Sequence, residues 1–135
     1  MQDLIGQLIG DRYRITGKIG EGGMATIYRA VDNRLDRVVA LKLINREVFS
    51  QDTIQTLLKR FEREARALAR MNHPNIVSVH DFGEFQGAPF LVMEYIEGGT
   101  LRERMGNPMP FQEPARLLVP IASALCYAHR NNIIH

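Results

Sequence analysis

The chain has 135 residues, of which 45% are hydrophobic and 24% are charged, as is typical of one globular domain with a buried core. A formal net charge of only +2 gives no support to nucleic-acid binding. The single cysteine, Cys126, excludes an internal disulfide and fits a reducing compartment, so we expect a cytoplasmic protein.

No segment of the sequence is suited to a membrane or to secretion. The longest apolar run, residues 117–128, is shorter than the roughly 20 residues of a transmembrane helix, and Pro120 interrupts it. The first residues lack the basic start and the cleavage site of a signal peptide. We therefore expect no membrane segment in this chain.

The first part of the chain predicts an antiparallel sheet. A glycine-rich turn at residues 20–25 joins two strands as a hairpin, and a polar turn at residues 32–36 leads into a third strand. Five strands are expected in all, at residues 13–19, 26–31, 37–44, 76–82 and 89–95.

Between the third and fourth strands the apolar spacing becomes helical. Residues 52–71 carry one apolar stripe at steps of three and four. The stripe consists of Ile54, Leu57, Leu58, Phe61, Ala65 and Leu68. The helix ends before Pro74, because proline disfavours helical geometry in the residue that precedes it.

Gly98-Gly99 marks the boundary between two parts of the chain. A short helix near residues 100–105 and a long helix at residues 113–131 follow the glycines. We therefore expect a sheet-and-helix domain at residues 1–97 and a helical part at residues 98–135.

The turn at residues 20–25, Gly-Glu-Gly-Gly-Met-Ala, predicts a phosphate site. Glycines bring backbone N–H groups close to a polyanion because no Cβ blocks the approach. Lys42 lies in an apolar strand, where a lone ammonium group is costly to desolvate unless an anion meets it. Strand alternation places Lys42 beside Ala40, which is small enough to leave room for a flat ligand. The alternative is a lysine that reaches from the strand into solvent.

Glu64 is the best candidate for an acidic partner of Lys42. A helical step of about 100° per residue puts Glu64 near the edge of the apolar stripe, whereas several arginines lie on the opposite face. The alternative is a surface ion pair between Glu64 and Arg60, one helical turn earlier.

In these features the chain resembles the protein kinases, and among them the bacterial Ser/Thr kinases of eukaryotic type. The kinase glycine-rich loop has the form G-x-G-x-x-G-x-V, and the third strand carries V-A-I-K. The matching residues here are Gly20, Gly22, Ala25, Ile27 and Val39-Ala40-Leu41-Lys42. Ala25 replaces the third glycine, which restricts the backbone at that point. Residues 61–65, 73–77 and 91–99 resemble the helix with the paired glutamate, the loop after it, and the fifth strand with the hinge between lobes.

The resemblance implies an α+β fold: a kinase N-terminal lobe, with a five-stranded antiparallel sheet and one main helix, then the first helices of an incomplete C-terminal lobe. It also implies ATP-dependent phosphorylation of protein Ser or Thr residues, with Lys42 bound to the phosphates and paired with Glu64. The implied ATP-binding residues are Ile19, Gly20, Glu21, Gly22, Gly23, Met24, Ala25, Ile27, Ala40, Lys42, Met93, Glu94 and Ile96.

The resemblance also divides these residues by role. Adenine would lie between Ile19, Ile27 and Ala40, with Met93 behind it, and the backbone of Glu94 and Ile96 would hydrogen-bond its edge. The alternative for Ile27 and Met93 is a place in the ordinary hydrophobic core.

The triplet Asp81-Phe82-Gly83 matches the kinase triplet whose aspartate binds Mg²⁺, but we do not assign it that role. It precedes the hinge, whereas the kinase triplet follows the catalytic loop, so we expect only the end of a strand entering a turn. His73, His80 and His129 lack the spacing of a metal site, so no metal ligands are expected.

The last five residues, 131–135, resemble the lead-in to the kinase catalytic loop H-R-D-L-x-x-x-N. The catalytic aspartate and the Mg²⁺ ligands of the full-length protein would follow His135, as would most determinants for a protein substrate. We therefore expect the 135-residue chain to bind ATP weakly and to be inactive by itself. The apolar face of the 113–131 helix is expected to cause self-association.

Two other classes of protein remain as alternatives. A dinucleotide-binding oxidoreductase also uses a glycine-rich turn, but that turn leads from a strand into a helix, whereas residues 26–31 predict a strand. The closer alternative is a non-catalytic kinase-like module that serves only for docking or dimerisation. Intact Lys42 and Glu64 favour a catalytic parent over this module.

Overall fold

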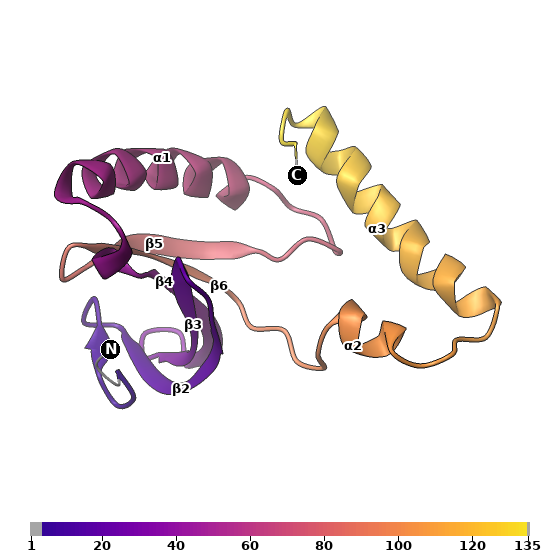
Figure 1. The fold of residues 1–135 in the computed structure, drawn as a ribbon, viewed down its shortest axis with the longest axis horizontal. Coiled ribbons are helices and arrows are strands. Elements are labelled where there is room, and N and C mark those ends of the chain that lie inside the picture. Colours follow the sequence, from indigo (N-terminus) through magenta and orange to yellow (C-terminus); the bar gives the residue numbers. More distant parts are fainter. Residues whose placement is uncertain (1–3, 135) are drawn as a thin grey trace. The chain divides into compact units, whose positions relative to one another are not determined.

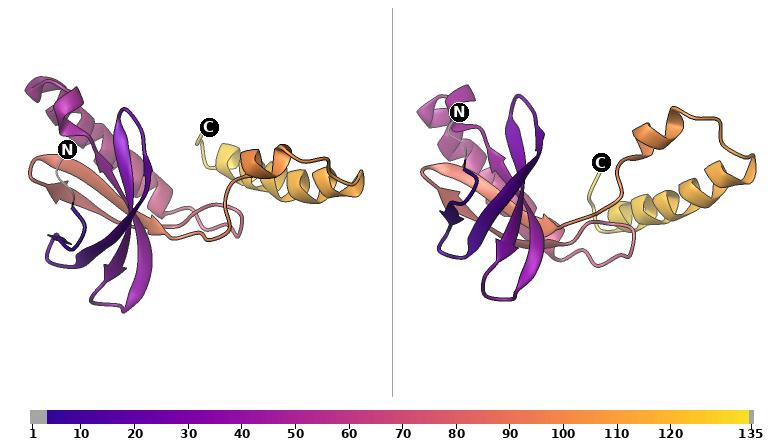
Figure 2. Two further views of the ribbon diagram at one scale, coloured as in Figure 1. Left: turned by 60° about the horizontal axis from the view of Figure 1, so that its bottom comes forward. Right: turned by 90° about the horizontal axis from the view of Figure 1, so that it is seen from below.

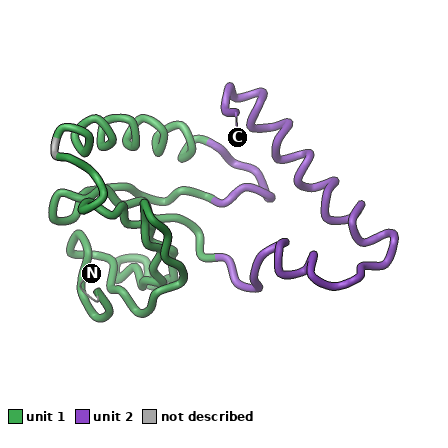
Figure 3. The backbone as a smooth tube through the Cα atoms, viewed as in Figure 1, with its two compact units in different colours: residues 1–70, 78–95 green, residues 71–77, 96–135 purple. Residues whose placement is uncertain are grey.

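The computed structural model describes residues 4–134, which form two compact units (Figure 3). The first unit contains the chain up to residue 70 together with residues 78–95. The second contains residues 71–77 and the chain from residue 96 onward. The division after residue 95 lies close to Gly98-Gly99, while the loop at 71–77 groups with the later helices.

The first unit is a curled antiparallel sheet with one long helix (Figures 1 and 2). Its elements are β1 (Leu8–Ile9), β2 (Tyr13–Glu21), β3 (Ala25–Asp32), β4 (Arg37–Ile44), a short 3-10 helix (Arg46–Val48), α1 (Gln51–Ala69), β5 (Val79–Phe85) and β6 (Ala88–Glu94). The strand order is β1-β2-β3-β4-β6-β5, and every neighbouring pair is antiparallel. The expected α+β class is confirmed, with a sixth strand added to the five.

Two strands differ from the expectation for local physical reasons. β1 has only two residues, which are too few to show an alternating pattern, and it pairs with β2. β5 begins at Val79 rather than at residue 76, because the turn after Pro74 continues to Ile76, whose N–H donates to the carbonyl of His73 at 3.1 Å. The strand then runs on to Phe85.

The hairpin between β5 and β6 turns at Gln86-Gly87, as expected. Both residues have positive φ, 51° for Gln86 and 77° for Gly87, which is the geometry of a tight two-residue hairpin turn. The expectation that Asp81-Phe82-Gly83 enters a turn is wrong. This triplet lies inside β5, where Gly83 faces the ring of Phe90 so closely that a Cβ would lie 2.7 Å from it.

The sheet separates its side chains onto two faces, as strand alternation requires. One face forms the hydrophobic core, which contains Leu4, Ile9, Tyr13, Ile15, Tyr28, Ala30, Val39, Leu41, Phe90 and Val92. Ala40, Lys42 and Ile44 alternate with the core residues of β4 and therefore lie on the other face. The predicted division of β4 into two faces is therefore correct.

Helix α1 forms because one face is apolar and its first turn is capped. The hydroxyl of Ser50 accepts a hydrogen bond from the N–H of Thr53, which satisfies one of the free donors at the helix start. Ile54 and Ala65 of the predicted stripe are buried, and the helix packs against β5 and β6 (Figure 1).

The second unit contains α2 (Leu101–Met105) and α3 (Gln112–Arg130). Residues 71–77 lie against α3 within this unit. The N–H of Asn72 donates to the hydroxyl of Tyr127 at 3.0 Å, and the Nε2 atom of His73 lies 3.2 Å from the hydroxyl of Ser123. His73 also packs its ring on Tyr127, so it has structural partners.

In the described part of the chain, neither long helix combines the length and the apolar character that crossing a bilayer requires.

Candidate functional site

The glycine-rich turn lies at the tip of the hairpin formed by β2 and β3. The N–H of Gly22 donates to the carbonyl of Ala25 at 2.9 Å, and the chain leaves the turn in an extended conformation. β2 is irregular on its way to the tip, since its register with β3 shifts between Lys18 and Gly20. The turn leads from strand to strand, so the alternative of a dinucleotide-binding unit is wrong.

The fold itself does not require glycine at the tip. A Cβ added to Gly20 or Gly23 would meet no atom within 4 Å, and one on Gly22 would only touch the carbonyl of Ala25 at 3.5 Å. None of the three has the positive φ that favours glycine. Their missing side chains therefore leave the backbone of the turn open to a neighbour from outside the chain.

The other residues of the turn are mostly exposed. Glu21 accepts a hydrogen bond from Lys18 at 2.7 Å, and this contact lowers the pKa of Glu21. The Met24 side chain is 64% exposed at the tip, and Ala25 is half-buried. Ile19, which precedes the turn, is 49% exposed and is therefore outside the hydrophobic core.

Lys42 occupies the middle of the sheet, opposite Ile27 of β3 and Leu91 of β6. Its side chain is half-buried, and Ala40 on the same face is 7% exposed. Met93 pairs with Ala40, so the structure brings Ile27, Ala40 and Met93 onto the sheet face that carries Lys42.

Ile27 and Met93 do not belong to the hydrophobic core. Each is half-buried, whereas the core cluster on the other face of the sheet is formed by buried residues. The alternative that both are ordinary core residues is therefore not supported, and their side chains keep apolar surface available on the Lys42 face.

The expected ion pair between Lys42 and Glu64 is not formed. Among the residues that the structure describes, no ion pair within 4.0 Å joins Glu64 to Lys42 or to Arg60, and Glu64 is exposed. The physical reason is the position of α1, which packs mainly against β5 and β6. Helical periodicity gives the direction of a side chain around its axis, but it does not give the position of the helix on the sheet.

Glu64 nevertheless lies on the same side of the sheet as Lys42. It lines a cavity of about 200 Å³ together with Ile44 and Met24, and Ile44 is two residues from Lys42 on the same strand face. The other lining residues are Phe49, Leu57, Arg60, Phe61 and Pro89. The two charged groups are therefore separated but not placed on opposite surfaces of the sheet.

The remaining predicted residues lie at the end of β6 and after it. Glu94 is the last residue of β6, and its N–H donates to the carbonyl of Ser78 at 2.9 Å. Ile96 is exposed and belongs to the second unit.

Asp81 has protein partners inside the first unit. Its carboxylate accepts a hydrogen bond from the hydroxyl of Tyr13 at 2.5 Å, and a guanidinium nitrogen of Arg12 lies 3.6 Å away. Burial and the hydrogen bond to Asp81 raise the pKa of Tyr13 well above its usual range. No group of three or more acidic, His or Cys side chains suitable for a metal ion occurs in residues 4–134.

Sequence reasoning missed the most buried charge of the molecule, Asp32. Its side chain is fully buried and accepts two hydrogen bonds from the guanidinium of Arg12, both at 2.8 Å. These bonds hold the pKa of Asp32 well below its usual range, against the opposing effect of burial. The alternation of β3 indicates that Asp32 is buried, because the residue continues the buried positions of the strand. The polar turn predicted at residues 32–36 instead implies that Asp32 is exposed.

Comparison with known proteins agrees with this geometry. The protein kinase domain family matches residues 13–135. The chain is 42% identical to the serine/threonine-protein kinase PrkC of Bacillus subtilis over 98% of its own length and 20% of that protein. It is 44% identical to PknL of Mycobacterium tuberculosis, over 95% of this chain and 32% of that one.

Solved structures give the same relation. The chain superposes on the kinase domain of Mycobacterium tuberculosis PknI with a TM-score of 0.81 at 28% identity, over 100% of this chain and 55% of that one. It thus spans about half of the solved domain and a fifth to a third of these two curated relatives. The chain belongs to the protein kinase family, and its relatives are serine/threonine-protein kinases.

Proposed function

We propose that this chain is the ATP-binding part of a Ser/Thr protein kinase. The phosphates would lie against the glycine-rich turn and the ammonium group of Lys42, and Mg²⁺-ATP would serve the full-length protein in transferring its γ-phosphoryl group to protein Ser or Thr residues. One observation carries the proposal. The glycines of the turn, which the fold does not require, lie on a hairpin that pairs directly with the strand of Lys42.

The adenine ring would lie on the apolar surface of the Lys42 face. Ile19, Ile27 and Ala40 would enclose it, with Met93 behind, and the partial exposure of three of these four side chains supports this role. The N–H of Glu94 is already bonded to Ser78, so Glu94 would offer its carbonyl to the adenine amino group.

The described residues do not provide a Mg²⁺ site, because they contain no group of three or more acidic, His or Cys side chains that could hold the ion. Asp81 belongs to the triplet that matches the kinase Mg²⁺-binding motif, but its carboxylate accepts a hydrogen bond from the hydroxyl of Tyr13. We propose that the 135-residue chain alone binds nucleotide without transferring phosphate. Incubation with labelled ATP and casein is expected to leave the casein unlabelled.

The binding claim is tested by isothermal titration calorimetry of the 135-residue chain with ATP. We expect weak binding, because only one side of a nucleotide site is provided by these residues. A dissociation constant below about 1 µM would contradict the expectation of weak binding, and no heat at millimolar ATP would contradict the proposed function itself.

Alanine substitutions at Gly20 and Gly23 are expected to separate binding from stability. The added methyl group meets no protein atom within 4 Å, so the free energy of unfolding should stay unchanged or rise by up to about 1 kcal/mol. The rise would come from the lower conformational entropy of the unfolded chain. ATP affinity should fall about tenfold, because the methyl group keeps phosphate away from the backbone N–H groups.

Gly17→Ala provides the matched control for these two substitutions. Gly17 lies in the same strand as Gly20, three residues before the turn begins, and a Cβ there also meets no atom within 4 Å. Calorimetry and thermal unfolding should give the parent values. Equal ATP affinities for Gly17→Ala and Gly20→Ala would argue against phosphate binding at the turn.

A second candidate function is a non-catalytic docking or dimerisation module. The observation that favours it is the exposed apolar surface of α3, where Leu118 is 55% and Val119 is 69% exposed. ATP binding discriminates between the two functions, since a docking module has no need of it. The residues encoded after His135 also discriminate: Arg-Asp, with an asparagine five residues after that aspartate, indicates an active kinase.

Self-association through α3 is expected in either case. The pair of substitutions Leu118→Glu and Val119→Glu should shift the chain toward the monomer in light scattering at tens of micromolar protein, because it places charge in the apolar surface. Gln112→Glu adds charge at an exposed polar position, the first residue of the same helix, and should have no effect. A parent chain that is already monomeric would rule out association through this surface.

A further inference from the structure

One residue outside the glycine-rich turn bonds to three of its carbonyl groups. Asn45 directly follows β4, and its amide nitrogen Nδ2 donates to the carbonyls of Gly22 at 3.1 Å and Gly23 at 3.4 Å. The backbone N–H of Asn45 donates to the carbonyl of Met24 at 2.9 Å. The carbonyls of three consecutive residues at the tip therefore share one donor residue, more than twenty positions further along the chain.

The orientation of the Asn45 amide is fixed by a fourth hydrogen bond. The hydroxyl of Thr26, a residue that is 1% exposed, donates to the Oδ1 atom of Asn45 at 3.2 Å. Rotating the amide by half a turn would place Oδ1 against two carbonyl oxygens, which have no hydrogen to donate. Nδ2 must therefore face the glycines.

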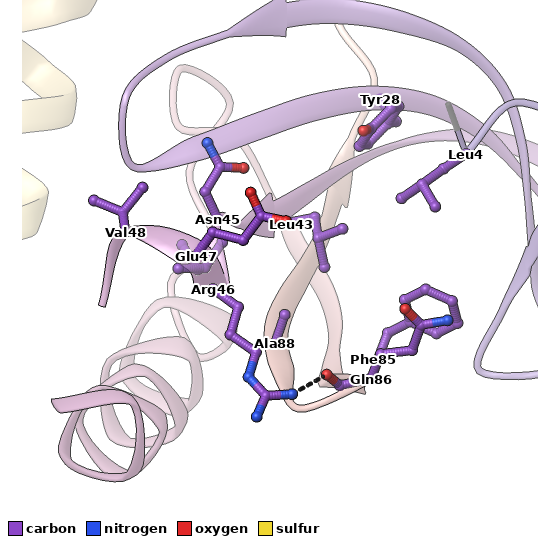
Figure 4. A pocket seen from close by; sticks show the side chains of 11 residues that line it. Leu4, Tyr28, Leu43, Asn45, Arg46, Glu47, Val48, Phe85, Gln86 and Ala88 are labelled. Atoms are coloured by element: carbon purple, nitrogen blue, oxygen red, sulfur yellow. Dashed lines mark hydrogen bonds between the residues drawn. The ribbon is translucent and has the colours of Figure 1, made fainter. Parts of the chain in front are cut away.

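Figure 4 shows Asn45 at the end of β4, among the side chains that line a cavity of about 400 Å³. Asn45 lies beside Glu47 and away from Leu4, which marks the apolar end of this cavity. Asn45 is half-buried as a residue, while its two bonds to the glycine carbonyls lie at the exposed tip. Asparagine is suited to this place because its short side chain both donates and accepts.

These bonds have an electrostatic consequence for the turn. A phosphate is repelled by carbonyl oxygens and attracted by N–H groups, and Asn45 engages the carbonyls of residues 22, 23 and 24. Within the described part of the chain, no hydrogen bond uses the N–H of Gly23 or Met24. The N–H groups of Gly23 and Met24 are thus available, while the N–H of Gly22 donates to Ala25 and the carbonyls of residues 22–24 are occupied.

We propose that Asn45 is a positioning residue for nucleotide binding: it holds the glycine-rich turn with the carbonyls of residues 22–24 engaged and the N–H groups of Gly23 and Met24 open to phosphate. The inference rests on the proposed ATP-binding function. Asn45 itself touches no nucleotide and acts only through the backbone of the turn.

The mobility of the turn tests the first half of the proposal without any nucleotide. The chain contains no tryptophan, so Met24→Trp introduces a single indole at the exposed tip. In this background Asn45→Asp keeps the side-chain shape but removes the Nδ2 donor and sets a carboxylate against two carbonyls. Fluorescence anisotropy of the indole should fall and its quenching by acrylamide should rise.

Nucleotide affinity tests the second half. In a chain that keeps Met24, Asn45→Asp should raise the dissociation constant for ATP about tenfold, as measured by calorimetry. The affinity falls because the loosened turn must become ordered when the nucleotide binds. Thr26→Val, which removes the hydroxyl that orients the amide, should have a smaller effect in the same direction. Thermal unfolding verifies that both variants are folded. If Asn45→Asp does not fold, Thr26→Val takes its place in the anisotropy and affinity measurements.

Asn33→Asp is the matched control, because it makes the same chemical change at an exposed turn at the opposite end of β3. It should leave anisotropy and affinity at parent values. Unchanged anisotropy in Asn45→Asp would overturn the proposal, as would a loosened turn with unchanged ATP affinity. If the parent chain binds no ATP at all, the proposed function fails, and the anisotropy still decides whether Asn45 holds the turn.

Discussion

Replacing Asp32 by asparagine is expected to lower the free energy of unfolding by about 3 kcal/mol or more, because it leaves the Arg12 charge without its buried partner. The Asp32 carboxylate also accepts hydrogen bonds from the N–H groups of Arg34 and Leu35, so it joins the residue before β2 to the turn that follows β3. Urea unfolding followed by circular dichroism measures the change.

Asp36→Asn is the matched control for this prediction. Asp36 is exposed and belongs to the same turn, and its φ of 54° is one that asparagine tolerates. The free energy of unfolding of the Asp36→Asn variant should stay within about 0.5 kcal/mol of that of the parent chain. The account of the buried pair would be contradicted if Asp32→Asn were as stable as Asp36→Asn.

The same buried pair predicts a loss of stability in acid. The pKa of Asp32 is well below its usual range in the folded state, whereas the unfolded carboxyl has a pKa of about 3.9. The unfolded state therefore binds the proton first, so this stabilisation is complete above that pKa and is lost as the pH falls below it. The unfolding midpoint of Asp32→Asn should depend less on pH in this range than that of the parent.

Replacing Lys42 by methionine is expected to raise the dissociation constant for ATP at least tenfold. Lys42 is half-buried and, among the described residues, has no ion-pair partner within 4.0 Å, so its charge is available to an anion. Stability should not fall, because a methionine removes the cost of desolvating the ammonium group and keeps the length of the side chain.

Lys59→Met makes the same change on the exposed surface of α1 and should leave ATP binding unaltered. The comparison also distinguishes the two candidate functions. A docking module would lose neither folding nor partner binding when Lys42 is replaced. If Lys42→Met and Lys59→Met bound ATP with equal affinity, Lys42 would not belong to the ATP site.

Much of the fold follows from local patterns in the sequence. The alternation in β4 predicted which side chains join the core, and the helical stripe predicted the buried residues Ile54 and Ala65 of α1. The turn predicted at Gln86-Gly87 is also found, although φ is positive at Gln86 as well as at the glycine. These features depend on neighbours within a few positions, so a single sequence contains the information.

The features that were missed depend on contacts between distant segments. The separation of Glu64 from Lys42 depends on where α1 packs on the sheet. The bonds of Asn45 to the glycine-rich turn and of Arg12 to Asp32 join residues about twenty positions apart. Neither contact leaves a periodic signal, although the alternation of β3 would have placed Asp32 on the buried face.

The central claim is that the backbone of the glycine-rich turn binds phosphate beside Lys42. A nuclear magnetic resonance titration of the ¹⁵N-labelled chain with a non-hydrolysable ATP analogue tests it most directly. The largest amide shifts are expected at residues 20–25, with further shifts around Ala40 and Lys42. Shifts confined to residues around Leu4 and Phe85, or none at millimolar analogue, would contradict the claim.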